Sequence, residues 1–202
     1  MIPRRVPAAA VLLAGGKSSR MGTNKALLRF DDGSTVAERI VGRVAPLCSG
    51  LLLVTNTPEE YAFLGLPMHP DAYPGASSLG GIYTGLLHAD AERVLVLSCD
   101  LPLINPDLLR YLLRLPFDYD LLMPFIAGRQ QPLHAIYAKS CLPAMQAQIQ
   151  AGDLKIVRLL DTLHGHIVTE ADLQPDWLPS FRNMNTPDDW AQVRQLVALE
   201  DP

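Results

Sequence analysis

A run of glycines and cations after the first apolar segment is the part of the chain best suited to chemistry. Gly15 and Gly16 end that segment, and the cations Lys17, Arg20 and Lys25 follow closely. Glycines let backbone N–H groups approach an anion without a Cβ in the way, and cations neutralise phosphate charge. The sequence therefore predicts a phosphate-binding loop. The alternative is an ordinary β–α turn with solvated cations.

Two common phosphate-binding motifs do not fit this loop. Gly16-Lys17-Ser18 matches the end of the P-loop motif, but Val11 stands where that motif needs its first glycine. The dinucleotide fingerprint also fails, because Lys17 occupies the place of its second glycine. We therefore expect the loop to bind phosphate in a way that neither motif describes.

A carboxylate at the end of a later apolar run suits a metal ion. Asp100 follows the run at 94–98. Mg²⁺ in phosphate-transferring sites takes one or two carboxylates, and phosphate oxygens and waters complete its shell. We expect Asp100 to hold Mg²⁺. The alternative is that this carboxylate only caps the following turn.

The glycine loop resembles the signature of nucleotidyltransferases, and most closely that of molybdenum cofactor guanylyltransferases. Residues 13–25 keep the pattern L-A-G-G-x-S-x-R-M-G-x-x-K, and residues 99–102 are similar to the family's C-D-x-P segment. The likeness extends from residue 8 to about residue 190. It implies a Rossmann-like nucleotidyltransferase fold, with residues 1–202 as a single three-layer domain.

The resemblance also implies roles for individual residues. Arg20 and backbone groups of the glycine loop hold the β- and γ-phosphates of a nucleotide, Lys25 stabilises charge at the α-phosphate, and Asp100 holds the metal. These three side chains are the expected catalytic residues. The expected nucleotide-binding residues are Leu13, Ala14, Gly15, Gly16, Lys25, Asn56, Asp71 and Asp100.

Asn56 and Asp71 are included because their positions resemble family positions that contact the nucleotide. An amide and a carboxylate suit a guanine edge and ribose hydroxyls, since specific polar partners reject the wrong base. Loop solvation or capping is the alternative for each. Ser77-Ser78 departs from the family's usual Gly-Pro. Cytidylyl relatives often carry serines there, which keeps cytosine open as the base. Residues 13–16 resemble the guanylyl version of the first loop and favour guanine.

Two later segments resemble the family on the side of the pterin substrate. Residues 129–137 are similar to its Q-P-L-x-A-x-Y stretch, within which we expect His134 to be a packed residue and not a catalyst. Residues 183–189 are similar to N-x-N-T-P-E-D, which implies that Asn183 and Asn185 line the cofactor pocket. Thr186 is adequately explained as a helix cap.

The elements that must position these residues alternate along the chain. Short apolar runs predict strands at 8–14, 51–55 and 94–98, and the capping signals at Thr35-x-x-Glu38 and Asn105-Pro106-Asp107 predict helix starts. Further strands are expected at 121–125, 133–138 and 166–169, and helices at 142–151, at 153–160 and from Thr186 onward. This alternation predicts an α/β fold with a mostly parallel sheet and helices on both faces.

Composition limits the classes of partner. The 202 residues carry a net charge of −4, which argues against a sequence-independent nucleic-acid binder. The apolar run at 8–14 is far short of the ~20 residues that span a bilayer, so we expect no membrane partner. Three scattered cysteines fit a reducing compartment, and a cytoplasmic location is expected.

The function that these observations imply is nucleotidyl transfer with Mg²⁺ as cofactor. A terminal phosphate of molybdopterin would attack the α-phosphate of GTP, and pyrophosphate would leave. The expected partners are GTP, molybdopterin, and other molybdenum cofactor proteins or apo-molybdoenzymes. One alternative is the same chemistry with CTP or another phosphate acceptor. The other is a non-catalytic nucleotide-binding module that delivers cofactor, which the presence of both Lys25 and Asp100 disfavours.

Overall fold

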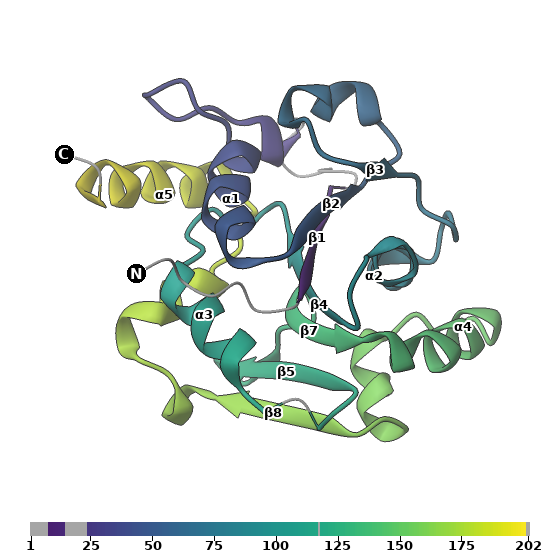
Figure 1. Cartoon of the computed structure of the whole chain (residues 1–202). Coiled ribbons are helices and arrows are strands. Elements are labelled where there is room, and N and C mark those ends of the chain that lie inside the picture. The colour runs from purple at the N-terminus through teal and green to yellow at the C-terminus, as the bar shows by residue number, and fades with distance from the viewer. Residues whose placement is uncertain (1–7, 15–23, 117, 201–202) are drawn as a thin grey trace.

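A mixed β-sheet forms the centre of the computed structural model, which describes residues 8–14, 24–116 and 118–200. In these residues the sheet has eight strands in the order β3-β2-β1-β4-β7-β5-β6, and β8 pairs with β5 (Figure 1). The strands are β1 (Ala9–Leu13), β2 (Gly50–Val54), β3 (Met68–His69), β4 (Arg93–Ser98), β5 (Leu121–Ile126), β6 (Arg129–Gln130), β7 (His134–Ala138) and β8 (Gly165–Thr169).

Five α-helices and several 3₁₀ turns connect the described strands. The α-helices are α1 (Val36–Val44), α2 (Ser77–His88), α3 (Pro106–Arg114), α4 (Leu142–Gln150) and α5 (Pro187–Glu200). The 3₁₀ turns are η1 (Lys25–Leu27), η2 (Ala45–Leu47), η3 (Pro58–Leu64), η4 (Lys139–Cys141), η5 (Ile156–Asp161), η6 (Glu170–Asp172) and η7 (Pro175–Phe181). Among the described residues, no helix combines the length and the apolarity that crossing a membrane requires.

The direction of the strands confirms the predicted fold class. β1 runs parallel to both β2 and β4, and β8 runs parallel to β5. The antiparallel strands are β7, between β4 and β5, and the short β6. The chain moves outward from β1 to β2 and β3 and then returns to β4 on the other side of β1. In open α/β sheets such a reversal opens a crevice at the carboxyl ends of the strands, where ligands bind.

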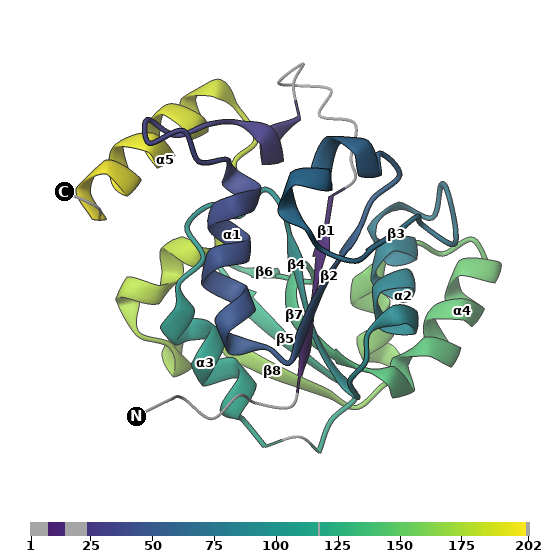
Figure 2. The same ribbon diagram turned by 45° about the horizontal axis from the view of Figure 1, so that its top comes forward.

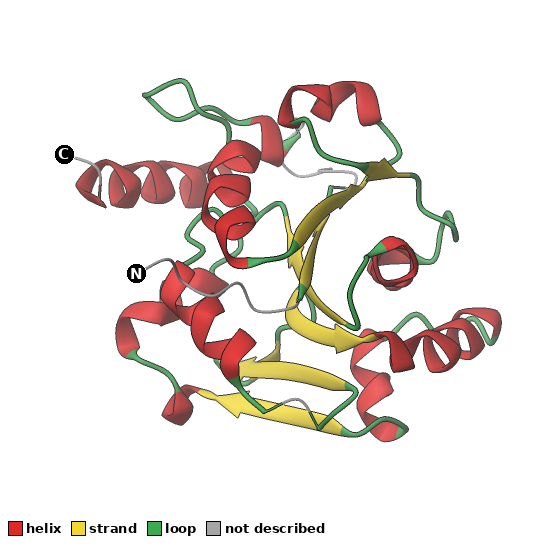
Figure 3. Cartoon of the chain, in the orientation of Figure 1, coloured by secondary structure: helices red, strands yellow, loops and turns green. Residues whose placement is uncertain are grey.

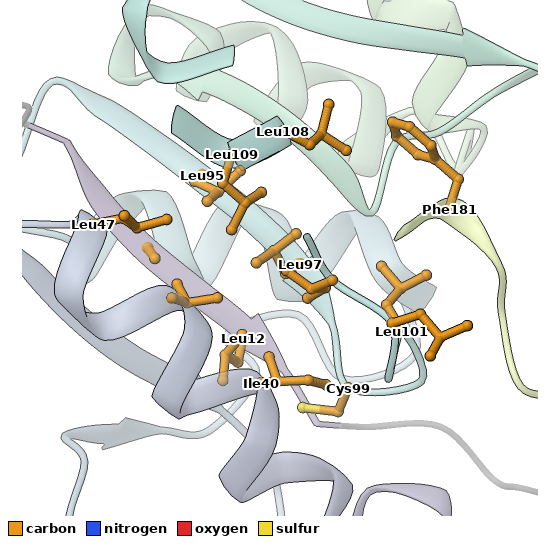
Figure 4. Close-up of a cluster of buried hydrophobic side chains, with 14 of the residues drawn as sticks. Leu12, Ile40, Leu47, Leu95, Leu97, Cys99, Leu101, Leu108, Leu109 and Phe181 are labelled. Atoms are coloured by element: carbon orange, nitrogen blue, oxygen red, sulfur yellow. The ribbon is translucent and has the colours of Figure 1, made fainter. Parts of the chain in front are cut away.

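Helices cover both faces of the sheet and give the fold three layers (Figures 2 and 3). Alternate residues of β1 point to opposite faces, as the pleat requires. Ala10 and Leu12 join a core with α1 and α3, whereas Val11 and Leu13 join a second core under α2 and α4. Figure 4 shows part of the first core, in which Leu12 and Ile40 lie beside Cys99 at the end of β4.

Local capping signals placed two of the helices correctly. Thr35 Oγ1 accepts from the N–H of Glu38 at 3.1 Å, and Glu38 Oε2 accepts from the N–H of Thr35 at 2.7 Å, so α1 begins in a complete capping box. Asn105 Oδ1 accepts from the N–H of Asp107 at 2.8 Å at the start of α3. Both helix starts agree with the sequence prediction.

The predicted helix at 153–160 is wrong. Gly152 has a φ of +73°, which ends α4, and Asp153 Oδ1 accepts from the N–H of Lys155 at 3.2 Å. This side-chain-to-backbone bond offers the chain a turn in place of a helix. Only the 3₁₀ turn η5 follows, from Ile156 to Asp161.

Helix α2, for which the sequence analysis gave no bounds, packs very closely on β1. A Cβ built on Gly85 would lie 2.4 Å from Cγ1 of Val11, and one on Gly81 would lie 3.4 Å from Cδ2 of Leu13. Glycine at these positions therefore lets the helix approach the strand. The same glycines lower the helix propensity of this segment, so the sequence pattern does not predict α2.

Candidate active site

The ends of β1 and β4 meet at the point where the strand order reverses. The N–H of Cys99 donates to the carbonyl of Leu13 at 3.2 Å, and the N–H of Ala14 donates to the carbonyl of Val54 at 3.0 Å. Leu13 and Ala14 are both buried. Gly15, Gly16 and Arg20, predicted to bind phosphate, lie outside the described residues.

Lys25 lies in η1, which is fixed by the residue before it. Asn24 Oδ1 accepts from the N–H of Ala26 at 3.2 Å, and Asn24 Nδ2 donates to Glu60 Oε2 at 2.7 Å and to Tyr61 Oη at 2.9 Å. Burial raises the pKa of Tyr61 to about 12, which keeps this hydroxyl neutral. Sequence reasoning missed Tyr61 and Asn24, because nothing in the pattern of η3 connects it with residue 24.

The head group of Lys25 has a defined partner. Its Nζ donates to Oδ1 of Asn185 at 2.8 Å, although the two residues are 160 positions apart. Asn185 was predicted to line the cofactor pocket, and the structure brings it to the expected catalytic lysine. Asn183, two residues earlier, is exposed, and no described residue contacts its side chain through a hydrogen bond.

Asp100 lies in the turn after β4, close to the same segment. Its carbonyl accepts from the N–H of Met184 at 3.0 Å, and its Oδ1 accepts from Oγ of Ser98 at 2.5 Å. Oδ2 has no hydrogen-bond partner among the described residues. The described chain has no group of three or more His, Cys, Asp or Glu side chains that could enclose a metal. A single half-buried carboxylate with one unbonded oxygen fits a metal ion that phosphate groups help to bind, as Mg²⁺ does.

Asn56 and Asp71 lie side by side at the ends of β2 and β3. Asn56 Oδ1 accepts from the N–H of Asp71 at 2.9 Å, and Asp71 Oδ1 accepts from the N–H of Tyr73 at 2.9 Å. A Cβ on Gly80 would lie 2.8 Å from that same oxygen, so glycine leaves room for the carboxylate. Nδ2 of Asn56 and Oδ2 of Asp71 have no partner among the described residues. One donor and one acceptor are thus available to a ligand at this edge.

His134 is packed, as the sequence analysis expected. It pairs with Leu97 of β4, is 1% exposed, and its ring lies 4.5 Å from that of Phe181, centroid to centroid. Neither ring nitrogen has a hydrogen-bond partner by distance and angle among the described residues. Burial lowers the pKa of His134 to about 4, although the nearby backbone of Ser180 acts in the opposite direction.

The low pKa of His134 predicts an acid-sensitive fold. Between its ordinary pKa of 6.5 and about 4 the unfolded chain binds a proton at this residue and the native chain does not, so stability falls as the pH falls. We expect the free energy of unfolding to drop by about 2 kcal/mol between pH 7 and pH 5 from this group. Urea unfolding of the wild type and His134→Leu checks it. His134→Leu should lose this pH dependence, whereas His166→Gln, which changes an exposed histidine, should keep it. If the free energy of unfolding of His134→Leu falls with pH as steeply as that of the wild type, the assignment is contradicted.

Comparison with known proteins shows the family of this chain. Residues 10–167 match the model of the MobA-like NTP transferase domain. The chain belongs to this family. The match includes Leu13, Asn56, Asp71 and Asp100, and it ends before Asn185.

Individual relatives of this MobA-like chain cover nearly its whole length. A probable molybdenum cofactor guanylyltransferase of Carboxydothermus hydrogenoformans is 38% identical over 94% of this chain and 96% of its own. One of Clostridium perfringens is 34% identical over 91% of this chain and 94% of its own. The crystal structure of molybdopterin-guanine dinucleotide biosynthesis protein A from Archaeoglobus fulgidus has a TM-score of 0.81 at 25% identity, and it covers 95% of this chain and 99% of its own.

Proposed function

We propose that this MobA-like nucleotidyltransferase transfers GMP from GTP to the terminal phosphate of molybdopterin, forming molybdopterin guanine dinucleotide and pyrophosphate. The names of its relatives support the reaction. The observation that carries it is the convergence of Lys25 and Asp100, which contact adjacent residues of one segment, Asn185 and Met184. A cation and a carboxylate brought together at the switch point of the sheet suit phosphate chemistry.

The reaction needs positioning and charge neutralisation more than a protein nucleophile. The acceptor phosphate is already ionised, so it attacks the α-phosphate directly as pyrophosphate leaves. Lys25 stabilises the charge that develops at the α-phosphate, and Asp100 holds Mg²⁺, which supplies charge neutralisation at the phosphates when it is bound. Arg20 and the backbone of Gly15 and Gly16 hold the β- and γ-phosphates.

The two remaining groups of residues set specificity in this proposal. The amide of Asn56 and the carboxylate of Asp71 contact the guanine base and the ribose, since each has an unbonded polar atom in the structure. Asn183, exposed beside Met184, contributes to the pterin side together with the neighbouring strand ends. We further propose that residues 1–202 act as one domain in the cytoplasm and pass the product to apo-molybdoenzymes or other molybdenum cofactor proteins.

Nucleotide-dependent thermal unfolding tests the choice of base. GTP with Mg²⁺ at 100 times its Kd should raise the Tm by about 5–10 °C, because a ligand that binds only the native state stabilises it. ATP, CTP and UTP at the same concentration should give smaller shifts. Asp71→Asn, which keeps the Oδ1 acceptor, should reduce the GTP shift without lowering the Tm of the free protein. Asp118→Asn, at the opposite edge of the sheet, is the matched control. A larger shift with CTP would contradict the assignment of guanine.

A further inference from the structure

One short segment contacts both residues that carry the charged groups of the candidate active site. The N–H of Met184 donates to the carbonyl of Asp100 at 3.0 Å, and Oδ1 of the next residue, Asn185, accepts from Nζ of Lys25 at 2.8 Å. Met184 is fully buried, so its side chain anchors the segment in the core. Asn185 therefore directly follows a residue whose backbone is bonded to that of Asp100.

Asn185 is itself fixed by the start of α5. Oδ2 of Asp189 accepts from the N–H groups of Asn185 and Thr186, each at 2.9 Å, and the N–H of Asp189 donates to Oγ1 of Thr186 at 3.1 Å. These bonds lower the pKa of Asp189, so the carboxylate stays charged near neutral pH. The backbone that presents the Asn185 side chain is thus fixed on its C-terminal side.

Helix α5 is docked on the segment that follows Lys25. The ring of Trp190 lies 4.8 Å from that of Phe30, centroid to centroid, and Arg194 forms an ion pair with Asp31. Val193, on the same helix, is fully buried. In Figure 2 the helix lies beside the hairpin that leads from η1 into α1. The C-terminal helix and the lysine are therefore held in one unit, although they lie at opposite ends of the chain.

From these contacts we propose that Asn185 is a positioning residue that holds the ammonium group of Lys25 in place for the α-phosphate. A lysine side chain is flexible, and ordering it costs rotamer entropy, which a fixed acceptor offsets before the substrate binds. A neutral carbonyl oxygen orients the ammonium and leaves its charge available to phosphate. A carboxylate at the same place would form an ion pair and cancel that charge. The proposal rests on the transfer reaction proposed above.

The proposal differs from the expectation that Asn185 contacts the pterin substrate. A residue that binds the acceptor changes the KM for molybdopterin, and its effect does not depend on Lys25. A residue that acts through Lys25 changes kcat, and its effect disappears when the lysine is absent. The two roles therefore separate in a double-mutant cycle.

The experiment measures kcat and both KM values for wild type, Asn185→Ala, Lys25→Ala and the double variant, with thermal unfolding as a check on folding. We expect Asn185→Ala to lower kcat about ten- to a hundredfold, with the KM for molybdopterin changed less than twofold. In the Lys25→Ala background the same change should cost nothing further. Additive losses in the cycle, or a tenfold rise in the KM for molybdopterin, would overturn the proposal.

A second measurement needs no turnover, so it separates this proposal from the transfer reaction. Acylation of Lys25 by a small reagent is followed by mass spectrometry, with Lys155 as the reference in the same sample. Asn185→Asp should slow acylation of Lys25 about threefold or more relative to Lys155, because a neighbouring carboxylate favours the protonated amine. An unchanged ratio would show that residue 185 does not contact the lysine in solution. If acylation of Lys25 slows as expected but the wild type forms no dinucleotide, the contact between Asn185 and Lys25 stands and the proposed transfer reaction is wrong.

Discussion

Asp100→Asn is expected to lower kcat about 100- to 1000-fold while the protein stays folded, which is the cost of losing one preorganised charged group. The carboxylate lies in the turn after β4 and is only half-buried, so an amide fits the same space. The amide can still accept from Oγ of Ser98, as Oδ1 of Asp100 does in the wild type. What it loses is the negative charge that Mg²⁺ requires. Steady-state kinetics with varied Mg²⁺ measures the effect.

The matched control for this change is Asp118→Asn. It removes one carboxylate from an exposed position just before β5, at the end of the strands opposite to Asp100. We expect its kcat and its dependence on Mg²⁺ to equal those of the wild type. If Asp100→Asn instead keeps activity within a few-fold of wild type at low Mg²⁺, Asp100 does not hold the metal.

Lys25→Ala should damage kcat more than the binding of GTP, again by about 100- to 1000-fold. Its ammonium donates to Asn185, next to the residue that bonds the backbone of Asp100, and we assign it to the α-phosphate. Lys17, Arg20 and the glycine loop are left to bind the β- and γ-phosphates. An interaction made mainly in the transition state lowers kcat and kcat/KM together, whereas one made equally in both states raises KM alone. Kinetics with varied GTP distinguishes these two cases.

Lys139→Ala is the corresponding control. This lysine follows β7, which is antiparallel to β4, so it lies at the start of β4 and Asp100 follows the end of that strand. Its kinetic constants should match those of the wild type. A rise of tenfold or more in the KM for GTP in Lys25→Ala, with kcat unchanged, would make Lys25 a binding residue and remove it from the catalytic step.

The fold was predictable where its causes are local. The side chains of Thr35 and Glu38, three residues apart, each accept a hydrogen bond from the other's backbone N–H. Four consecutive residues are therefore enough to predict the start of α1. The apolar strands β1, β2 and β4 were likewise evident from short buried runs. The two residues of β3 carry too little pattern to be recognised, and the glycines of α2 oppose helix formation except where β1 lies against them.

The candidate site was predictable as a set of residues but not as an arrangement. Lys25, Asp100 and Asn185 each stood out by residue type and by family resemblance. The hydrogen bond between Lys25 and Asn185 joins positions 160 apart, and the segments that follow these two residues pack together where Trp190 contacts Phe30. Contacts of this kind arise from tertiary packing, which leaves no periodic signal in a single sequence. The support that Tyr61 gives to Asn24 was missed for the same reason.

The measurement that tests the central claim most directly is product formation from a panel of nucleotides. Purified protein is incubated with Mg²⁺, molybdopterin and either GTP, ATP, CTP or UTP, and both pyrophosphate and the dinucleotide are quantified. We predict that GTP yields equal amounts of pyrophosphate and molybdopterin guanine dinucleotide, and that the other nucleotides and the reaction without acceptor yield far less. Binding of GTP without pyrophosphate release, under conditions in which molybdopterin is intact, would contradict the account and indicate a protein that binds the nucleotide without transferring it.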